Sequence, residues 1–332
     1  MSMPGPTPQG NVIRDSFAPG DEDIEFQDWE DIEFALQSRI DRLQEGGAYG
    51  ASGGRIWITG PCSLWQTPVL KGAVTLDFCN NMVMAYGSDG FMRVEGALGA
   101  GIRNVRVQVH DQPSAALWLS SEDGDDIAFC RFERLRLVRY ARSARGMTDG
   151  IRIEPHGSAR IRYNMFEDIL IHGFARSLVL FNSSTHEHAL EGNRFSHLRC
   201  EDFIRRMVYF GYNGDDASHP KGMGRNVFDH IYGNAATLGQ VEDPSSLRLP
   251  SMRLTAGDGN HFHHFALFAR NSLKESWEVT ESAVNTQLIA FEAGYLPDQM
   301  QTSGNQIVMP MEQTNATAWI QGREKCCDKD VS

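Results

Sequence analysis

A repeated pattern of one asparagine and several apolar residues dominates the middle of the chain. Each unit has an Asn, a Phe two residues later and another apolar residue three positions after the Phe, in segments about 30 residues apart: Asn164–Ile169, Asn193–Leu198, Asn226–Ile231 and Asn260–Phe265. A period of roughly 20 to 50 residues with strand-like content indicates units that bury their apolar faces by stacking on one another.

The repeat extends in both directions beyond these four units. Phe132 and then Ile102 continue the series toward the N-terminus, each followed by apolar residues at the matching positions. Ile307, preceded by Asn305, continues it as the next unit after Phe262. We therefore expect one continuous stack of units over most of the chain.

The apolar positions within a unit predict two short strands joined by a bend. In the unit of Phe166, the apolar residues Ile169 and Ile171 follow two polar residues. Strict alternation would turn Asp168 to the same face as Phe166, so a corner is needed for Phe166 and Ile169 both to point inwards. Further apolar runs follow within the units, at Ala115–Leu119, Ile151 and Ile153, Leu178–Phe181 and Met207–Phe210.

Several strands per unit and a fixed return point predict an all-β chain, a right-handed parallel β-helix. One stack of rings is expected inside it, made by Phe132, Phe166, Phe195, Phe228 and Phe262. The repeated asparagines would stack at about 4.8 Å, each side-chain amide bonding the next.

The pattern divides the chain into four parts. Residues 1–27 are rich in Pro, Gly and acidic residues and predict an extended arm; residues 28–46 predict a helix, 47–311 the β-helix and 312–332 a tail. The helix has one apolar stripe, made by Trp29, Ile32, Leu36, Ile40 and Leu43. A helix at this place is expected to cap the open end of the β-helix core.

Composition narrows the classes of partner. The net charge of −12 and the pI near 5.4 argue against nucleic acid and anionic membranes as general partners. We expect no membrane insertion and no signal peptide, because no apolar run is long enough to span and the N-terminus lacks the charged and apolar regions of a signal. The six cysteines lack metal-ligand spacing and predict buried free thiols.

The predicted helix, the Gly-rich link after it, the strand Gly53–Ile58 (GGRIWI) and the N-x-F-x-x-I/L coils resemble one family. They are similar to the pectate-lyase-like β-helix proteins of bacteriophage tail spikes and capsule depolymerases. The resemblance implies a homotrimer in a virion, assembled in the host cytoplasm, that binds a bacterial surface polysaccharide and in many members cleaves it as a glycoside hydrolase or lyase. Residues 1–27 are then expected to attach to other virion proteins.

A different function stays open beside this one. Only residues 312–332 follow the predicted β-helix, which leaves no room for the C-terminal trimerisation or carbohydrate-binding domain that many spikes carry. A non-catalytic structural virion component, such as a tail adaptor or capsid decoration protein, is the alternative.

Aligned positions of the repeat become columns in space, and two of these columns combine acids with histidines. The candidate catalytic residues are Asp168, His197, Asp229, His230 and His264. A carboxylate beside an imidazole on adjacent coils suits general acid–base catalysis. The alternative is a polar corner that tolerates these residues without using them. A straight histidine ladder does not by itself converge on a metal, so we expect neither a metal nor a cofactor.

Candidate ligand-binding residues are basic or aromatic: Arg134, Arg136, Trp118, Tyr212 and Trp277. The arginines could bind an acidic glycan, or pair with Glu167 and Asp168 on the neighbouring coil. The aromatic rings could stack on sugars or simply pack. Residues 271–303 and 213–224 are the longest stretches between repeats and are expected to form loops that wall a groove.

Overall fold

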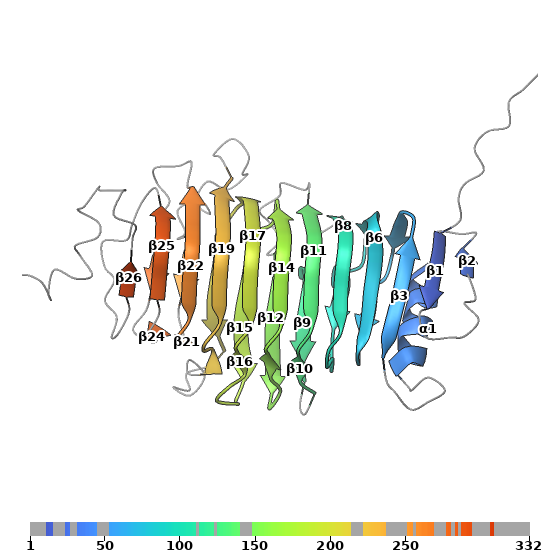
Figure 1. Cartoon of the computed structure of the whole chain (residues 1–332), viewed down its shortest axis with the longest axis horizontal. Coiled ribbons are helices and arrows are strands. Elements are labelled where there is room, and N and C mark those ends of the chain that lie inside the picture. The colour runs from blue at the N-terminus through green and yellow to red at the C-terminus, as the bar shows by residue number, and fades with distance from the viewer. Residues whose placement is uncertain are drawn as a thin grey trace, which may run out of the picture.

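The computed structural model describes residues 11–15, 24–26, 32–44, 53–110, 113–122, 125–139, 148–213, 222–236, 251–254, 257–268, 277–279, 283–284, 287–293 and 306–308. The chain is an elongated solenoid of parallel strands whose coils stack along its long axis (Figure 1). The predicted parallel β-helix is confirmed.

The largest sheet, called the long sheet here, has the spatial order β2, β1, β3, β6, β8, β11, β14, β17, β19, β22, β25, β26, with β4 beside β6. Its strands are β1 (Asn11–Asp15), β2 (Ile24–Phe26), β3 (Gly54–Thr59), β4 (Cys62–Leu64), β6 (Val74–Ala85), β8 (Gly101–Val109), β11 (Arg131–Arg139), β14 (Met165–His172), β17 (Arg194–Phe203), β19 (Val227–Ala235), β22 (His261–Phe268), β25 (Gln287–Ala293) and β26 (Gln306–Val308). Strand β1 pairs antiparallel with β2 and β3, and the other pairs are parallel.

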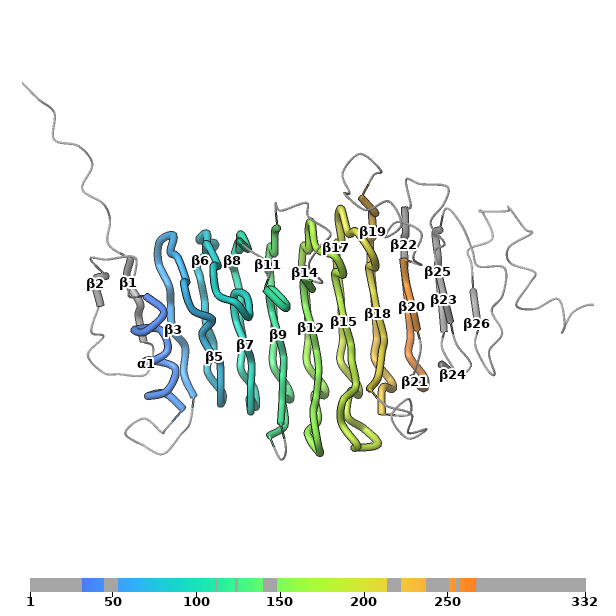
Figure 2. Tube along the Cα trace, turned by 180° about the vertical axis from the view of Figure 1, so that it is seen from behind, coloured from blue at the N-terminus to red at the C-terminus, as the bar shows by residue number. Residues whose placement is uncertain are grey.

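Two further layers, each with fewer strands, complete the solenoid. The second sheet, seen from behind in Figure 2, contains β5 (Val69–Leu70), β7 (Met92–Val94), β9 (Ala115–Ser121), β12 (Asp149–Gly157), β15 (Arg176–Ser184), β18 (Arg206–Tyr212), β20 (Met252–Leu254) and β23 (Trp277–Val279). Short strands form the third side, namely β10 (Ile127–Ala128), β13 (Ile161–Arg162) and β16 (Leu190–Glu191), with the separate pair β21 (Gly257–Asp258) and β24 (Ala283–Val284).

The predicted stack of phenylalanine rings runs through the core. Consecutive rings are 4.5 to 4.8 Å apart and nearly parallel, and all five are fully buried: Phe132, Phe166, Phe195, Phe228 and Phe262. Their register is exact, since Phe166 pairs with Phe132 on one side and with Phe195 on the other. One apolar residue per coil at a fixed place therefore sets the register of the long sheet.

The predicted corner is a single residue in the left-handed backbone conformation. It lies two positions after the core apolar residue in six successive coils, at φ between 49° and 57°: Asn104, Arg134, Asp168, His197, His230 and His264. This residue interrupts the alternation of the strand, so the apolar side chains before and after it both point inwards.

The asparagines form the predicted ladder. Nδ2 of Asn164, Asn193 and Asn226 donates to Oδ1 of the asparagine on the next coil at 3.0, 3.1 and 3.0 Å. Each Nδ2 also donates to a backbone carbonyl, and each Oδ1 accepts a backbone N–H, as Asn193 Oδ1 does from Asn164 N at 3.1 Å. The ladder thus satisfies backbone groups that the turn leaves unpaired in the interior.

The helix α1 (Ile32–Gln44) lies against the first coils at one end of the solenoid (Figure 1). Ile32, Leu36, Ile40 and Leu43 are buried in the same core as the strands, while Trp29 is outside the described residues. The Gln37 side chain accepts from Val69 N at 2.8 Å and donates to Val69 O at 3.1 Å. It thereby pairs the backbone of β5 at the exposed edge of the second sheet.

Two expectations from the sequence are corrected. The unit after Phe262 is that of Leu288, which pairs with Phe262, and Ile307 belongs to the coil after it. The stretch 271–303 therefore contains β23, β24 and β25 and is not one long loop. The sequence analysis took Ile307 as the next unit because Asn305 precedes it, whereas Leu288 has no Asn two residues before it.

The second correction concerns the cysteines. Cys62, Cys130 and Cys200 are buried free thiols, as predicted, but Cys79 is exposed. Cys79 and Asn80 both adopt left-handed conformations where β6 turns the corner, with a register shift between Asp77 and Asn81. The extra residues in this coil carry the thiol outwards. Cys326 and Cys327 lie outside the described residues.

Candidate functional site

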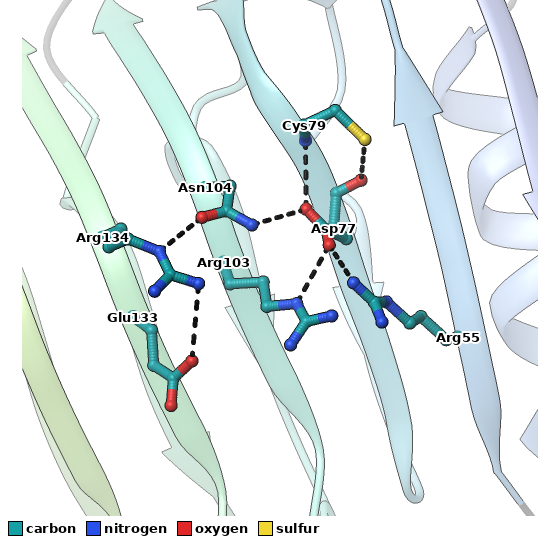
Figure 3. A network of polar contacts seen from close by, with 7 residues as sticks. All are labelled: Arg55, Asp77, Cys79, Arg103, Asn104, Glu133 and Arg134. Atoms are coloured by element: carbon teal, nitrogen blue, oxygen red, sulfur yellow. Dashed lines mark hydrogen bonds and ion pairs between the residues drawn. The ribbon is translucent and has the colours of Figure 1, made fainter.

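The N-terminal part of the corner is held by a continuous polar network (Figure 3). Asp77 is almost completely buried and accepts from Arg103 Nε at 3.0 Å, Asn104 Nδ2 at 2.8 Å and Cys79 N at 3.1 Å, in addition to Arg55. Arg134 Nε then donates to Asn104 Oδ1 at 2.5 Å. These contacts join four coils, so this part of the corner is a structural brace.

The backbone explains part of the composition of the corner. Asn, Asp and His are the non-glycine residues that enter the left-handed region most readily. The left-handed backbone at these positions is therefore enough to explain why Asn104, Asp168 and the three histidines of the column occur there. Their residue types alone do not establish catalysis.

The C-terminal part of the corner gathers histidines around one carboxylate. We define the histidine corner as His197, Asp229, His230 and His264. The rings of His197 and His230 stack at 4.9 Å, and those of His230 and His264 at 4.4 Å. Nδ1 of His230 and Nδ1 of His264 lie 2.9 and 3.1 Å from the same Oδ1 of Asp229.

Among Asp229, His230 and His264, the side chain of Asp229 is the least exposed to solvent. Burial alone would raise its pKa, but the hydrogen bonds and positive charge of His264 and His230 together act more strongly and hold the pKa below its usual value. The carboxylate is therefore ionised at neutral pH. The arrangement can hold a proton, orient an imidazole or offer nitrogen and oxygen donors to a cation.

The other predicted corner residues lie on coils that are not adjacent to the coil of Asp229. Asp168 forms an ion pair with Arg136 of the preceding coil at 3.2 Å, and its coil lies on the far side of His197 from Asp229. Arg134, besides bonding Asn104, lies 4.0 Å from Glu133. The structure thus brings together four of the five candidate catalytic residues, while Arg134 and Arg136 take part in cross-coil or local pairing.

A second candidate site opens on the outer face of the second sheet. Eight residues line a depression of about 480 Å³, which we call the Trp118 cavity: Arg93, Trp118, Ser120, Glu122, Arg152, Glu154, His156 and Gly157. Its floor comes from β7, β9 and β12, where Arg93, Trp118 and Arg152 occupy one register position on adjacent strands. The guanidinium carbons of Arg93 and Arg152 lie 5.1 and 5.5 Å from the centre of the indole.

Charged groups in the cavity are fixed by ion pairs. Arg152 Nε donates to Glu154 Oε2 at 2.8 Å, and Arg93 Nε lies 2.6 Å from Glu95. Glu154 is buried; its Oε1 accepts from Ser183 Oγ at 3.3 Å, and His156 Nε2 lies 3.8 Å from Oε2. The cavity therefore presents donors and acceptors that are already oriented.

The third side of the solenoid carries an exposed aromatic pair. Phe129 and Tyr163 stack with ring centres 5.6 Å apart, and both adopt left-handed φ values. Phe129 is 64% exposed, whereas neighbouring coils place Gly99 and Gly192 at the equivalent turn. The pair is therefore an exposed aromatic feature of this side of the solenoid.

The remaining predicted residues are distributed as follows. Trp118 lies in the cavity, and Tyr212 is half-buried at the end of β18, packed on the core. Trp277 begins β23 in register with Met252, but its side chain is outside the described residues, as are positions 214–221. The sequence analysis missed Arg93, Arg152, Glu154 and His156. The signal was present, because Arg152, Glu154 and His156 alternate with inward residues along one strand.

Comparison with models of known protein families and with curated protein sequences gave no match. Among the described residues, no helix has both the length and the apolar character needed to cross a membrane. The class of protein defined by the structure is therefore a parallel β-solenoid with two polar surface sites. Function is inferred from the chemistry of those sites.

Proposed function

We propose that the protein is a spike- or fibre-type virion protein that binds a bacterial surface polysaccharide in the Trp118 cavity. The observation that carries this proposal is the cavity itself, in which two arginines, two glutamates and a histidine surround an indole on a rigid sheet. A concave site with a few convergent polar groups is the usual form of a ligand site.

The chemistry of the cavity suits a polyhydroxylated ligand. Each sugar hydroxyl donates and accepts, so it needs both kinds of partner, and guanidinium and carboxylate groups provide them side by side. Because Arg152 and Glu154 are already held by their mutual ion pair, binding would cost little side-chain ordering. The balance of charges favours a neutral or zwitterionic glycan over a strongly acidic one.

The indole ring of Trp118 provides a flat surface on which a sugar can pack. Trp118 is flanked by Arg93 and Arg152 on the neighbouring coils, which fixes its orientation. A sugar would pack along its remaining accessible surface while the charged groups bond its hydroxyls. The solenoid extends this polar face along its axis, which suits a polymer better than a small free molecule.

The resemblance to tail-spike and depolymerase β-helices supports a place in a virion, a homotrimeric assembly and attachment through residues 1–27. The proposed function is binding of the polysaccharide without cleavage of it. The left-handed backbone accounts for Asp168, His197, His230 and His264, although not for Asp229, and Glu154 forms an ion pair with Arg152. A protein that binds no glycan would be the structural virion component considered above.

The test is a panel of purified bacterial capsular and lipopolysaccharide glycans, with binding of the full chain measured by biolayer interferometry. We expect Trp118→Ala to weaken binding at least tenfold because it removes the floor of the cavity. Trp65→Ala is the matched control, since Trp65 is an exposed indole outside the cavity, and it should leave binding unchanged. Circular dichroism and melting curves of both variants check the fold.

Two other outcomes would overturn the proposal, and a third would extend it. Loss of binding in Phe129→Ala with Trp118→Ala unaffected would move the glycan site to the aromatic pair. A wild-type chain that binds no glycan in the panel but assembles onto particles would support the structural alternative. Shortening of a bound polysaccharide that Glu154→Gln abolishes would add cleavage to the function.

A further inference from the structure

We propose that Asp229, His230 and His264 form a binding site for one divalent transition-metal ion of the Zn²⁺, Ni²⁺ or Cu²⁺ class. This site is on the long sheet and its assignment does not depend on the proposed glycan binding. One ligand atom from each residue, a carboxylate oxygen and two imidazole nitrogens, lies within 4.8 Å of the other two.

The register of the β-helix brings these atoms together. His230 and His264 are the corner residues of two adjacent coils, and their rings stack with planes 20° apart. Asp229 directly precedes His230 and pairs with His263, the residue before His264. The carboxylate therefore lies beside the histidine column, and both Nδ1 atoms face its Oδ1.

A histidine column alone would be a poor metal site because its donors lie in a line. The added carboxylate from the neighbouring column turns the line into a triangle. Two edges of this triangle measure 2.9 and 3.1 Å. A tetrahedral zinc with bonds of about 2.0 to 2.2 Å needs ligand separations of roughly 3.3 Å, so small side-chain rotations bring the three donors onto one ion.

The donor set selects the class of metal. Two imidazoles and one carboxylate favour Cu²⁺, Ni²⁺ and Zn²⁺, whereas Mg²⁺ and Ca²⁺ prefer oxygen ligands throughout. The imidazoles would bind through Nδ1 as Nε2–H tautomers, and the ionised carboxylate would offset part of the charge of the ion. His230 and His264 are each about half exposed, which leaves the remaining coordination positions open to water or another ligand.

The surroundings keep the three residues in place. Their backbones belong to β19 and β22, which are paired in register along their length. His197 stacks on the other face of His230 and limits its rotation. Because the strands fix the backbone, binding would order side chains only, and the sheet itself would not have to rearrange.

The experiment uses the full chain without a histidine tag, treated with a chelator and then desalted. Zn²⁺ is titrated by isothermal calorimetry, and Co²⁺ is added separately to follow its visible absorption, which rises when the ion enters a nitrogen- and oxygen-containing protein site. We expect one equivalent of Zn²⁺ per chain at this site, and a loss of affinity of at least tenfold in Asp229→Asn and in His264→Gln.

His172→Gln is the matched control. His172 also lies within 4 Å of carboxylates, but its Nδ1 faces Glu201 and its Nε2 faces Asp202, so those ligand atoms diverge. This variant should bind Zn²⁺ like the wild type. Melting curves without metal confirm that each variant is folded.

Three results would overturn the proposal. The first is wild-type binding no tighter than millimolar, which would leave the corner as a hydrogen-bonded array. The second is unchanged affinity in His264→Gln, and the third is equal loss of affinity in His172→Gln and Asp229→Asn.

Discussion

The asparagine ladder allows a sharp prediction about stability, for which we choose Asn193→Ala. Asn193 is fully buried and occupies an interior position of the ladder. Its Nδ2 donates to Ile161 O and Asn226 Oδ1, and its Oδ1 accepts from both nitrogens of Asn164. Alanine removes all four hydrogen bonds, because its side chain has no donor or acceptor to replace the amide.

The expected cost follows from the groups left behind. A buried hydrogen bond contributes about 1 kcal/mol net, and an abandoned buried donor or acceptor costs about 1 to 3 kcal/mol. The substitution leaves two donors of Asn164 and the carbonyl of Ile161 without this partner. Some of these penalties overlap, so we expect the free energy of unfolding to fall by about 3 to 5 kcal/mol. For a domain of this size the melting temperature would fall by roughly 6 °C or more.

The assay is equilibrium urea unfolding followed by circular dichroism, together with calorimetric melting. Arg199→Ala is the control, because the side chain is 63% exposed and pairs with Glu201 on its own strand. It should change the free energy of unfolding by no more than about 0.5 kcal/mol. If the free energy of unfolding of Asn193→Ala also stays within about 1 kcal/mol of the wild-type value, the hydrogen bonds of the ladder do not stabilise the fold to this extent.

Three further predictions concern the labelling of the cysteines, the contribution of Asp229 to stability at low pH, and the capping of the core by α1. Burial raises the pKa of Cys200 to about 12, so at pH 8 a maleimide should label exposed Cys79 much faster, and equal rates by peptide mass spectrometry would contradict this. The pKa of Asp229 is lowered in the folded state, so its contribution to stability is present above the unfolded value of about 3.9 and is lost as pH falls through the lower folded value. Asp229→Asn should therefore lower the melting temperature at pH 6, and a difference that persists undiminished at pH 2 would be inconsistent with this linkage. Ile40→Asp should expose the end of the core and give aggregates in light scattering, whereas Phe34→Asp on the exposed face of α1 should not; equal behaviour would argue against capping.

The fold could be predicted because two residue types, Phe and Asn, recur at fixed places in successive coils. Phe166 and its equivalents mark the core position, and Asn164 and its equivalents mark the turn before it. Leu288 escaped detection because it lacks the preceding Asn that marks Ile307, although a core position accepts any apolar side chain of suitable size. Repeat analysis therefore locates a coil less reliably where the Phe and the Asn are both replaced.

The candidate sites were less predictable, for a geometric reason. Arg93 and Arg152 meet around Trp118 only because their strands adopt one particular register, and the loops between those strands differ in length. At the histidine corner, the spacing placed His230 and His264 on adjacent coils correctly. It could not show that both would turn Nδ1 toward the same oxygen of Asp229, because that depends on side-chain rotamers.

The ladder and the ring stack also have a consequence for how such a molecule can change over evolutionary time. Asn193 and Asn226 have equivalent partners before and after them, as Phe195 and Phe228 do. A gene duplication that copied one whole interior coil would supply its own asparagine and its own ring, and would leave both ends of the solenoid as they are. The length of the protein can thus change in steps of one coil, while a single residue inserted within a strand would turn the later side chains of that strand to the wrong face unless a bulge absorbs it, as in β6.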